Sequence, residues 1–115
     1  MGPSRELQAL RDAVLGEHAD QVLTPEQRRA IAARAGSPGS TTGEDATPAG
    51  LRPLVEKISR WAYKVTQEDL DALRAAGFSE EQLYEATVAA ALGAAWSRLD
   101  AGLRALDAAA KEPTS

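Results

Sequence analysis

The chain has 115 residues, which is the length of one ordinary domain, and its hydrophobic content of 43% is close to the globular average. Its 17 acidic and 13 basic residues give a formal charge of −4, which argues against nucleic acid as a partner because phosphate binding requires a basic face. The absence of cysteine excludes disulfides, thiol nucleophiles and cysteine zinc sites.

Two helices are predicted near the N-terminus. Apolar residues recur at helical spacing over Leu7–Leu15, and Gly16 ends that pattern. Residues 24–27 (Thr-Pro-Glu-Gln) then form a capping-box pattern with proline at the first helical position, and the helix that they open ends at Gly36. We therefore predict an N-terminal helical hairpin over residues 1–36.

Residues 37–50 (SPGSTTGEDATPAG) have the composition of a flexible linker and no apolar periodicity. They predict a boundary between the hairpin at 1–36 and a helical core at 51–112. A linker of this length is uncommon inside a compact domain. The hairpin is therefore a candidate docking element for a neighbouring subunit or for another protein.

A helix with one apolar face is predicted from Leu51 to Val65. A carboxylate and a phenol on its opposite face could act as acid and base or hold a polar ligand. The commoner explanation of such a face is solvation and surface salt links. The residues of this polar face are Arg52, Glu56, Ser59 and Tyr63.

Two further helices complete the prediction. Residues 66–69 form an N-cap with an acidic first turn, and the short helix that follows is closed by Gly77. Residues 79–82 form a third capping box, which opens the longest helix, to about Ala110. Gly102 lies on the apolar stripe of that helix, where close approach of another helix would offset its cost of about 1 kcal/mol. The stripe comprises Tyr84, Val88, Ala91, Leu92, Ala95, Leu99, Leu103 and Leu106. The predicted fold is all-α, with about five helices.

Residues 70–106 (LDALRAAGFSEEQLYEATVAAALGAAWSRLDAGLRAL) combine a short helix ending in Leu-Arg-x-x-Gly, an acidic capping turn and a long alanine-rich helix. In this arrangement the chain resembles the C-terminal part of the carboxymuconolactone decarboxylase and AhpD-like alkylhydroperoxidase superfamily. Members of that family are all-helical and assemble as trimers, hexamers or other closed rings. The resemblance thus implies an AhpD-like helical core and a homo-oligomer. Independently of the resemblance, a short chain whose core is poor in aromatic residues is only marginally stable alone, which favours self-association.

The peroxidase branch of that family carries Cys-x-x-Cys-x-x-x-His just before the Leu-Arg-x-x-Gly helix. Counted back from Leu73, these positions hold Ala62, Val65 and Asp69 here, so the thiolate and the resolving thiol of peroxidase chemistry are missing. The decarboxylase branch uses a histidine in this region, where the chain offers only Glu68 or Asp69. The resemblance therefore implies a non-peroxidatic protein that acts as a binding or accessory module.

A second hypothesis is an enzyme with repurposed acid–base chemistry, a decarboxylase, isomerase or lyase that acts on a small anionic metabolite. Its candidate catalytic residues are Tyr63, Glu56 and Asp69. This hypothesis requires a pocket in which at least two such groups converge with a shifted pKa. The candidate ligand-binding residues are Arg98, Arg52 and Trp96. For Arg98 the commoner explanation is an ion pair with Glu56 or Glu85, and for Trp96 it is packing between subunits.

No metal or cofactor is expected, because His18 is the only histidine and the sequence holds no spaced carboxylate motif and no phosphate-binding glycine loop. We interpret His18 as an exposed loop residue. No run of about 18 apolar residues is present to cross a membrane. Residues 1–15 carry charges throughout and lack the apolar centre of a signal peptide, so the sequence predicts a cytoplasmic protein.

Overall fold

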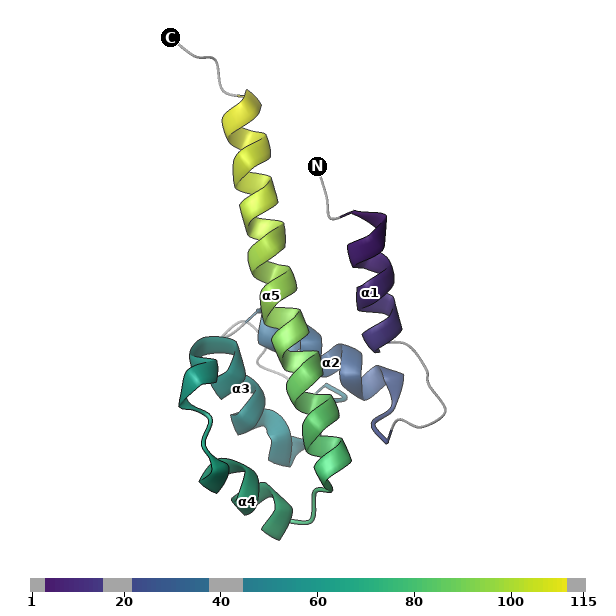
Figure 1. Ribbon diagram of the computed structural model, residues 1–115, viewed down its shortest axis with the longest axis vertical. Helices are drawn as coiled ribbons and strands as arrows, with labels where there is room; N and C mark the ends of the chain where they lie inside the picture. Colours follow the sequence, from purple (N-terminus) through teal and green to yellow (C-terminus); the bar gives the residue numbers. More distant parts are fainter. Residues whose placement is uncertain (1–3, 16–21, 38–44, 112–115) are drawn as a thin grey trace.

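The structure, a computed structural model, describes residues 4–15, 22–37 and 45–111. All regular structure within these three ranges is helical, which confirms the predicted all-α fold. The α-helices are α1 (Arg5–Leu15), α2 (Pro25–Gly36), α3 (Arg52–Trp61), α4 (Gln67–Ala75) and α5 (Glu80–Lys111), with short 3-10 turns η1 (Ala49–Leu51) and η2 (Ala62–Lys64) (Figure 1).

The helix boundaries follow from local hydrogen bonds that the sequence predicted. In each of the three capping boxes, the N-cap hydroxyl accepts the N3 backbone N–H and the N3 side chain accepts the N-cap N–H. At the end of α4, Gly77 adopts φ +108 and the Phe78 N–H donates to the Leu73 carbonyl, as in a Schellman motif. The capping boxes pair Thr24 with Gln27, Thr66 with Asp69, and Ser79 with Gln82.

One core joins α2, α3 and the first half of α5, with α2 lying across α5 (Figure 1). From α2, Ile31 is fully buried and Ala35 is 1% exposed. Helix α2, from the predicted N-terminal hairpin, thus shares one buried cluster with α3 and α5. The remaining buried apolar residues are Leu23, Ala32, Leu51, Leu54, Val55, Ile58, Leu83, Ala86, Ala89, Ala90 and Ala94.

The crossing of α2 and α5 brings the two backbones into direct contact. A Cβ added to Gly93 would overlap the Ala32 carbonyl oxygen. A Cβ on Gly36 would lie 3.0 Å from the Gly93 carbonyl oxygen. At Gly102, by contrast, a Cβ would meet no described atom within 4 Å. The close approach that we expected at Gly102 therefore occurs at Gly93 within this chain.

A polar cluster ties the start of α2 to the first turns of α5. The Glu85 carboxylate accepts the backbone N–H groups of Val22 and Leu23, each at 2.8 Å. Glu85 also lies 3.8 Å from Nη1 of Arg28, which donates to the Leu23 carbonyl and is only 2% exposed. The buried guanidinium is thus neutralised by a carboxylate from a helix far along the chain.

The buried face of α5 is not the apolar stripe that we predicted. Its buried residues are Leu83 and four alanines that end at Ala94, whereas Tyr84 is 72% exposed and Leu106 is 64% exposed. No residue of α5 after Ala94 is buried within the described chain, and this half of the helix projects beyond the core (Figure 1). Alanines face α2 because backbone contact at Gly93 leaves no room there for larger side chains.

The predicted helix from Leu51 to Val65 ends early, at Trp61. Residues 62–64 form η2 instead, and Val65 is extended with ψ 124. Thr66 must also be extended in order to cap α4, so the helical conformation has to end before it. This break removes Tyr63 from the face that carries Glu56.

Candidate functional site

The residues of the predicted polar face of α3 occupy separate surroundings. Ser59 is buried, and its Oγ donates to the Ala35 carbonyl at 2.5 Å, which links α3 to the end of α2. Glu56 pairs with Arg60 one turn away, with 3.5 Å between Oε2 and Nε. Tyr63 is 79% exposed on η2. These side chains support packing or face solvent, and they do not converge.

The two arginines predicted to bind a ligand lie on different helices, Arg98 on α5 and Arg52 on α3. Arg98 donates from Nη2 to the Ser59 carbonyl at 2.9 Å, which ties α5 to α3. Among the described residues it forms no ion pair with Glu56 or Glu85, so the ion pair that we expected is replaced by a hydrogen bond to backbone. Arg52 is partly buried in the first turn of α3.

Asp69 lines a groove of about 290 Å³ between α3 and α4. It accepts a hydrogen bond from Lys57 Nζ at 2.8 Å and from the Thr66 N–H at 2.9 Å. These bonds, the Lys57 bond first, lower the pKa of Asp69 below its ordinary value. A carboxylate held ionised in this way is a weak base at neutral pH, and neither Glu56 nor Tyr63 lines the same groove.

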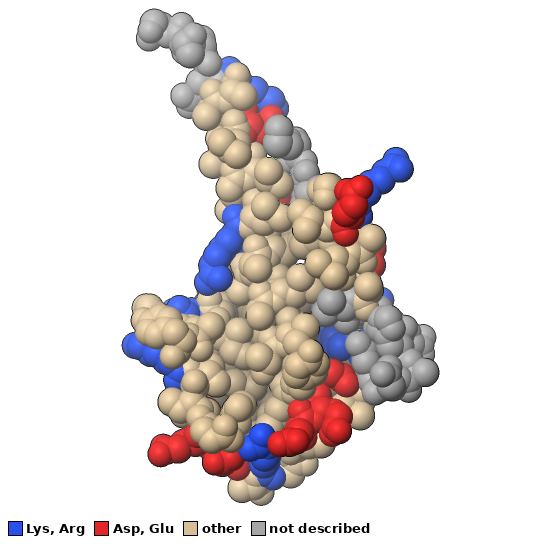
Figure 2. All heavy atoms as spheres, in the orientation of Figure 1, with Lys and Arg blue, Asp and Glu red and all other residues tan. Residues whose placement is uncertain are grey.

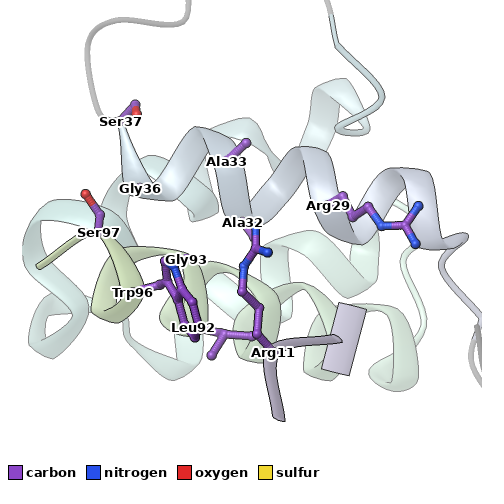
Figure 3. Close-up of a pocket in the computed structure, with 10 residues that line it drawn as sticks. All are labelled: Arg11, Arg29, Ala32, Ala33, Gly36, Ser37, Leu92, Gly93, Trp96 and Ser97. Atoms are coloured by element: carbon purple, nitrogen blue, oxygen red, sulfur yellow. The ribbon is translucent and has the colours of Figure 1, made fainter. Parts of the chain in front are cut away.

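A pocket of about 220 Å³ lies where α1, α2 and α5 meet. Its floor is formed by the backbone contact of α2 with α5 at Gly36 and Gly93, and its apolar wall by Leu92 and Trp96 (Figure 3). We call it the α1–α2–α5 pocket. Its lining residues are Arg11, Arg29, Ala32, Ala33, Gly36, Ser37, Leu92, Gly93, Trp96 and Ser97.

Among the described residues that line the α1–α2–α5 pocket, the charged ones are both arginines and none is a carboxylate. The guanidinium of Arg11 lies 5.2 Å from the centroid of the Trp96 ring, within the range of a cation–π contact. In Figure 3, Arg11 reaches from α1 toward α2 beside that ring, whereas Arg29 extends along α2 toward its N-terminal end. Ser37 and Ser97 supply hydroxyls at the opposite end of the pocket.

Of the residues that line this pocket, the sequence analysis identified Trp96 but neither of the two arginines. Trp96 was predicted to bind a ligand, and it does line the α1–α2–α5 pocket. Arg11 and Arg29 were not predicted, because they belong to two helices whose juxtaposition no local pattern specifies. The alanine and glycine content around Gly93 was the only available signal, since it favours close helix packing.

Within the described ranges, no cluster of three or more His, Cys, Asp or Glu side chains is placed to hold a metal ion. His18 lies outside the described residues. No described helix combines the length and apolar content needed to cross a bilayer.

Comparison of the chain with protein-family models, with curated proteins and with solved structures gives no match.

Proposed function

We propose that this chain is a non-catalytic helical binding module of the cytoplasm that takes a small, planar, anionic ligand in the α1–α2–α5 pocket. The observation that carries the proposal is the placement of Arg11 over Trp96 in a pocket whose described lining includes a second arginine and no carboxylate. The protein as a whole has a formal charge of −4, so this cationic pocket departs from its surroundings. Such a local field concentrates anions.

The dimensions and lining of the pocket favour a small aromatic carboxylate. A guanidinium binds a carboxylate through paired N–H donors, and Trp96 and Leu92 offer an apolar surface to a ring. A pocket of about 220 Å³ lies below the usual range of roughly 300–1,000 Å³ for drug-sized ligands. A single ring with one carboxylate is therefore the class of ligand that we propose.

Two observations favour binding over catalysis. The candidate catalytic residues Tyr63, Glu56 and Asp69 occupy separate surroundings, and Asp69 has a lowered pKa. The proposal also agrees with a non-peroxidatic AhpD-like protein, since Ala62 and Val65 lie where that family carries its cysteines. No observation among the described residues favours the alternative of an acid–base enzyme.

The binding proposal is tested with benzoate on the full chain. Trp61→Phe leaves Trp96 as the only tryptophan, and its fluorescence then reports occupancy of the pocket. We expect benzoate to bind saturably and benzamide, its neutral counterpart, to bind much more weakly. Arg11→Gln should raise the Kd for benzoate about ten-fold, or about 1.4 kcal/mol.

Arg5→Gln serves as the matched control, because Arg5 lies on the same helix but does not line the pocket. It should leave the Kd unchanged. Equal affinity for benzoate and benzamide, or an equal effect of the two arginine substitutions, would contradict the proposal.

The non-peroxidatic part of the proposal has its own test. With no cysteine in the chain, hydroperoxide consumption with dihydrolipoamide as donor should stay at the rate of buffer alone. Turnover that follows the protein through successive purification steps would exclude this assignment and leave the binding result untouched.

A further inference from the structure

The projecting half of α5, residues 95–111, contributes nothing to the core of its own chain. None of its residues is buried, and Leu99 and Leu106 are 36% and 64% exposed. Figure 2 shows the visible face of this projection covered mainly by uncharged side chains, with acidic and basic groups side by side nearer its tip. Single exposed leucines are ordinary, but a periodic row of them on a protruding helix requires an explanation.

The spacing of this row is that of a coiled-coil seam. Its members alternate at intervals of four and three residues, which keeps them on one side of a helix that winds around a partner. Ala95, Gly102 and Ala109 flank the row at every seventh position and leave room for a second backbone. The row, which we call the leucine seam, consists of Leu92, Trp96, Leu99, Leu103, Leu106 and Ala110.

The charges beside the leucine seam indicate the identity and direction of the partner. Asp100 pairs with Arg104 at 2.9 Å and Asp107 pairs with Lys111 at 3.1 Å, so the signs alternate along the helix. When these four charged residues are set against a copy that runs in the reverse direction, a basic residue lies opposite each acidic one. A second copy of α5 that runs antiparallel is therefore complementary in charge, whereas a parallel copy would set like charges at equal height.

Helix α1 points to the same partner. It has 11 residues, fewer than the roughly 12–15 that an isolated helix needs in water. Leu7 and Leu10 are 40% and 55% exposed, and α1 touches α5 through Arg11 and Trp96. A second α5 packed along the leucine seam would therefore also lie beside the exposed leucines of α1.

We propose that two copies of this chain associate through antiparallel packing of their projecting α5 helices. The twofold axis lies between Arg104 and Asp107, so that Leu103 of one copy packs against Leu106 of the other. Asp100 then faces Lys111 of the second copy, and Arg104 faces Asp107 of the second copy. The seam shares Leu92 and Trp96 with the α1–α2–α5 pocket, but the facing pairs named here lie beyond that pocket, so the ligand-binding proposal can fail without affecting this one.

The apolar part of the interface is tested by sedimentation equilibrium over a dilution series of the full chain. The wild type should dissociate reversibly from dimer to monomer. Leu106→Glu should raise the dimer Kd at least about ten-fold, because it places a charge in the seam. Ala108→Glu adds the same charge to an exposed position on the other side of the helix and should leave the Kd unchanged.

Circular dichroism separates dissociation from unfolding, because both substitutions lie outside the core and should preserve the helix content. A wild type that stays monomeric throughout the series, or equal effects of Leu106→Glu and Ala108→Glu, would overturn the proposal.

The direction of the helices is tested by exchanging charges within each intrahelical pair. One variant carries Asp100→Lys with Arg104→Glu, and the other carries Asp107→Lys with Lys111→Glu. Each variant keeps its own i,i+4 pairs but places like charges opposite one another in an antiparallel homodimer. Each alone should therefore dimerise more weakly than the wild type.

Mixing the two variants should restore a heterodimer of wild-type affinity, because every facing pair is then of opposite sign. In a parallel dimer, residues of the same number face each other, so each variant alone would pair like charges as the wild type does and would dimerise no more weakly. The mixture would then associate more tightly than the wild type, because all four positions pair opposite charges. Failure of the mixture to associate beyond either variant alone would overturn the antiparallel arrangement.

Discussion

The two halves of α5 differ in what they bury and in what holds them. The first half, residues 80–94, turns alanines and Gly93 toward α2 and is covered by it. The second half, residues 95–111, carries more leucine but has no buried residue. In this protein, residues of α5 are buried where its backbone closely approaches that of another helix. Small side chains such as alanine allow that approach and are therefore buried, whereas larger side chains on the same helix stay exposed.

Polar contacts show the same contrast. In the first half, Glu85 is 11% exposed and binds two backbone N–H groups as well as the buried Arg28. In the second half, the ion pairs join residues four apart on the helix surface and are substantially exposed. Pairs of the second kind contribute only about 0.3–0.5 kcal/mol each. The first half is thus fixed by its contacts with α2, whereas the ion pairs of the second half beyond Arg98 lie within its own helix.

The sharpest test of this contrast compares the two glycines. Gly93→Ala should lower the free energy of unfolding by about 3 kcal/mol or more, because the new Cβ meets the backbone of Ala32. Gly102→Ala should raise it by about 1 kcal/mol at concentrations where the chain is monomeric, since alanine favours helix and the site is open. Urea unfolding of both variants measures the difference, and similar changes at the two sites would contradict it.

The next largest effect is expected at Glu85. Glu85→Ala should lower the free energy of unfolding by about 2–3 kcal/mol, because it removes the acceptor of two N–H groups and the carboxylate beside the buried Arg28. Glu81→Ala, at an exposed position one turn earlier, should change the unfolding free energy by less than about 0.5 kcal/mol. Equal losses in urea unfolding would show that the cluster does not anchor α2.

The smallest effect is acid dependence, which should come from Asp45 and Asp69, outside α5, and not from the projecting half of α5. Burial works to raise the pKa of Asp45, but hydrogen bonds from Thr47 and the nearby Arg34 lower it overall, and the pKa of Asp69 is lowered by Lys57 and Thr66. A lowered folded-state pKa stabilises the protein above the ordinary value of about 3.9. That contribution is lost as the pH falls through the folded-state pKa.

Asp69→Asn should therefore reduce the stability lost between neutral pH and acid, as followed by thermal unfolding across a pH series. Asp107→Asn changes an exposed pair in the projection and should leave the acid profile as in the wild type. A larger change from Asp107→Asn than from Asp69→Asn would contradict the assignment of the acid-sensitive contacts to Asp45 and Asp69.

The sequence was sufficient for features that depend on neighbouring residues. The capping boxes at Thr24, Thr66 and Ser79 were predicted because donor and acceptor lie three residues apart. The buried face of α5 was predicted wrongly because hydropathy ranks leucine above alanine. The contact at Gly93 depends on α2, whose position no local pattern specifies.

The candidate site was harder to predict from the sequence, because its residues come from helices whose relative positions no local pattern specifies. Trp96 was identified from its residue type, but Arg11 reaches it from a helix 85 positions earlier in the chain (96 − 11). The polar face of α3 was a local pattern, and the break after Trp61 together with the burial of Ser59 divided it. Residues that line a pocket between helices are specified by packing, which periodicity on one helix does not report.

The cluster at Glu85 also constrains when the protein can fold during its synthesis. The carboxylate that receives the N–H of Val22 is encoded 63 residues later. At a ribosomal rate of about 5–20 residues per second, α2 emerges roughly 3–13 seconds before the helix that covers it. During that interval the side of α2 that α5 covers remains open to solvent on the nascent chain, and it offers a surface that a ribosome-associated chaperone can bind.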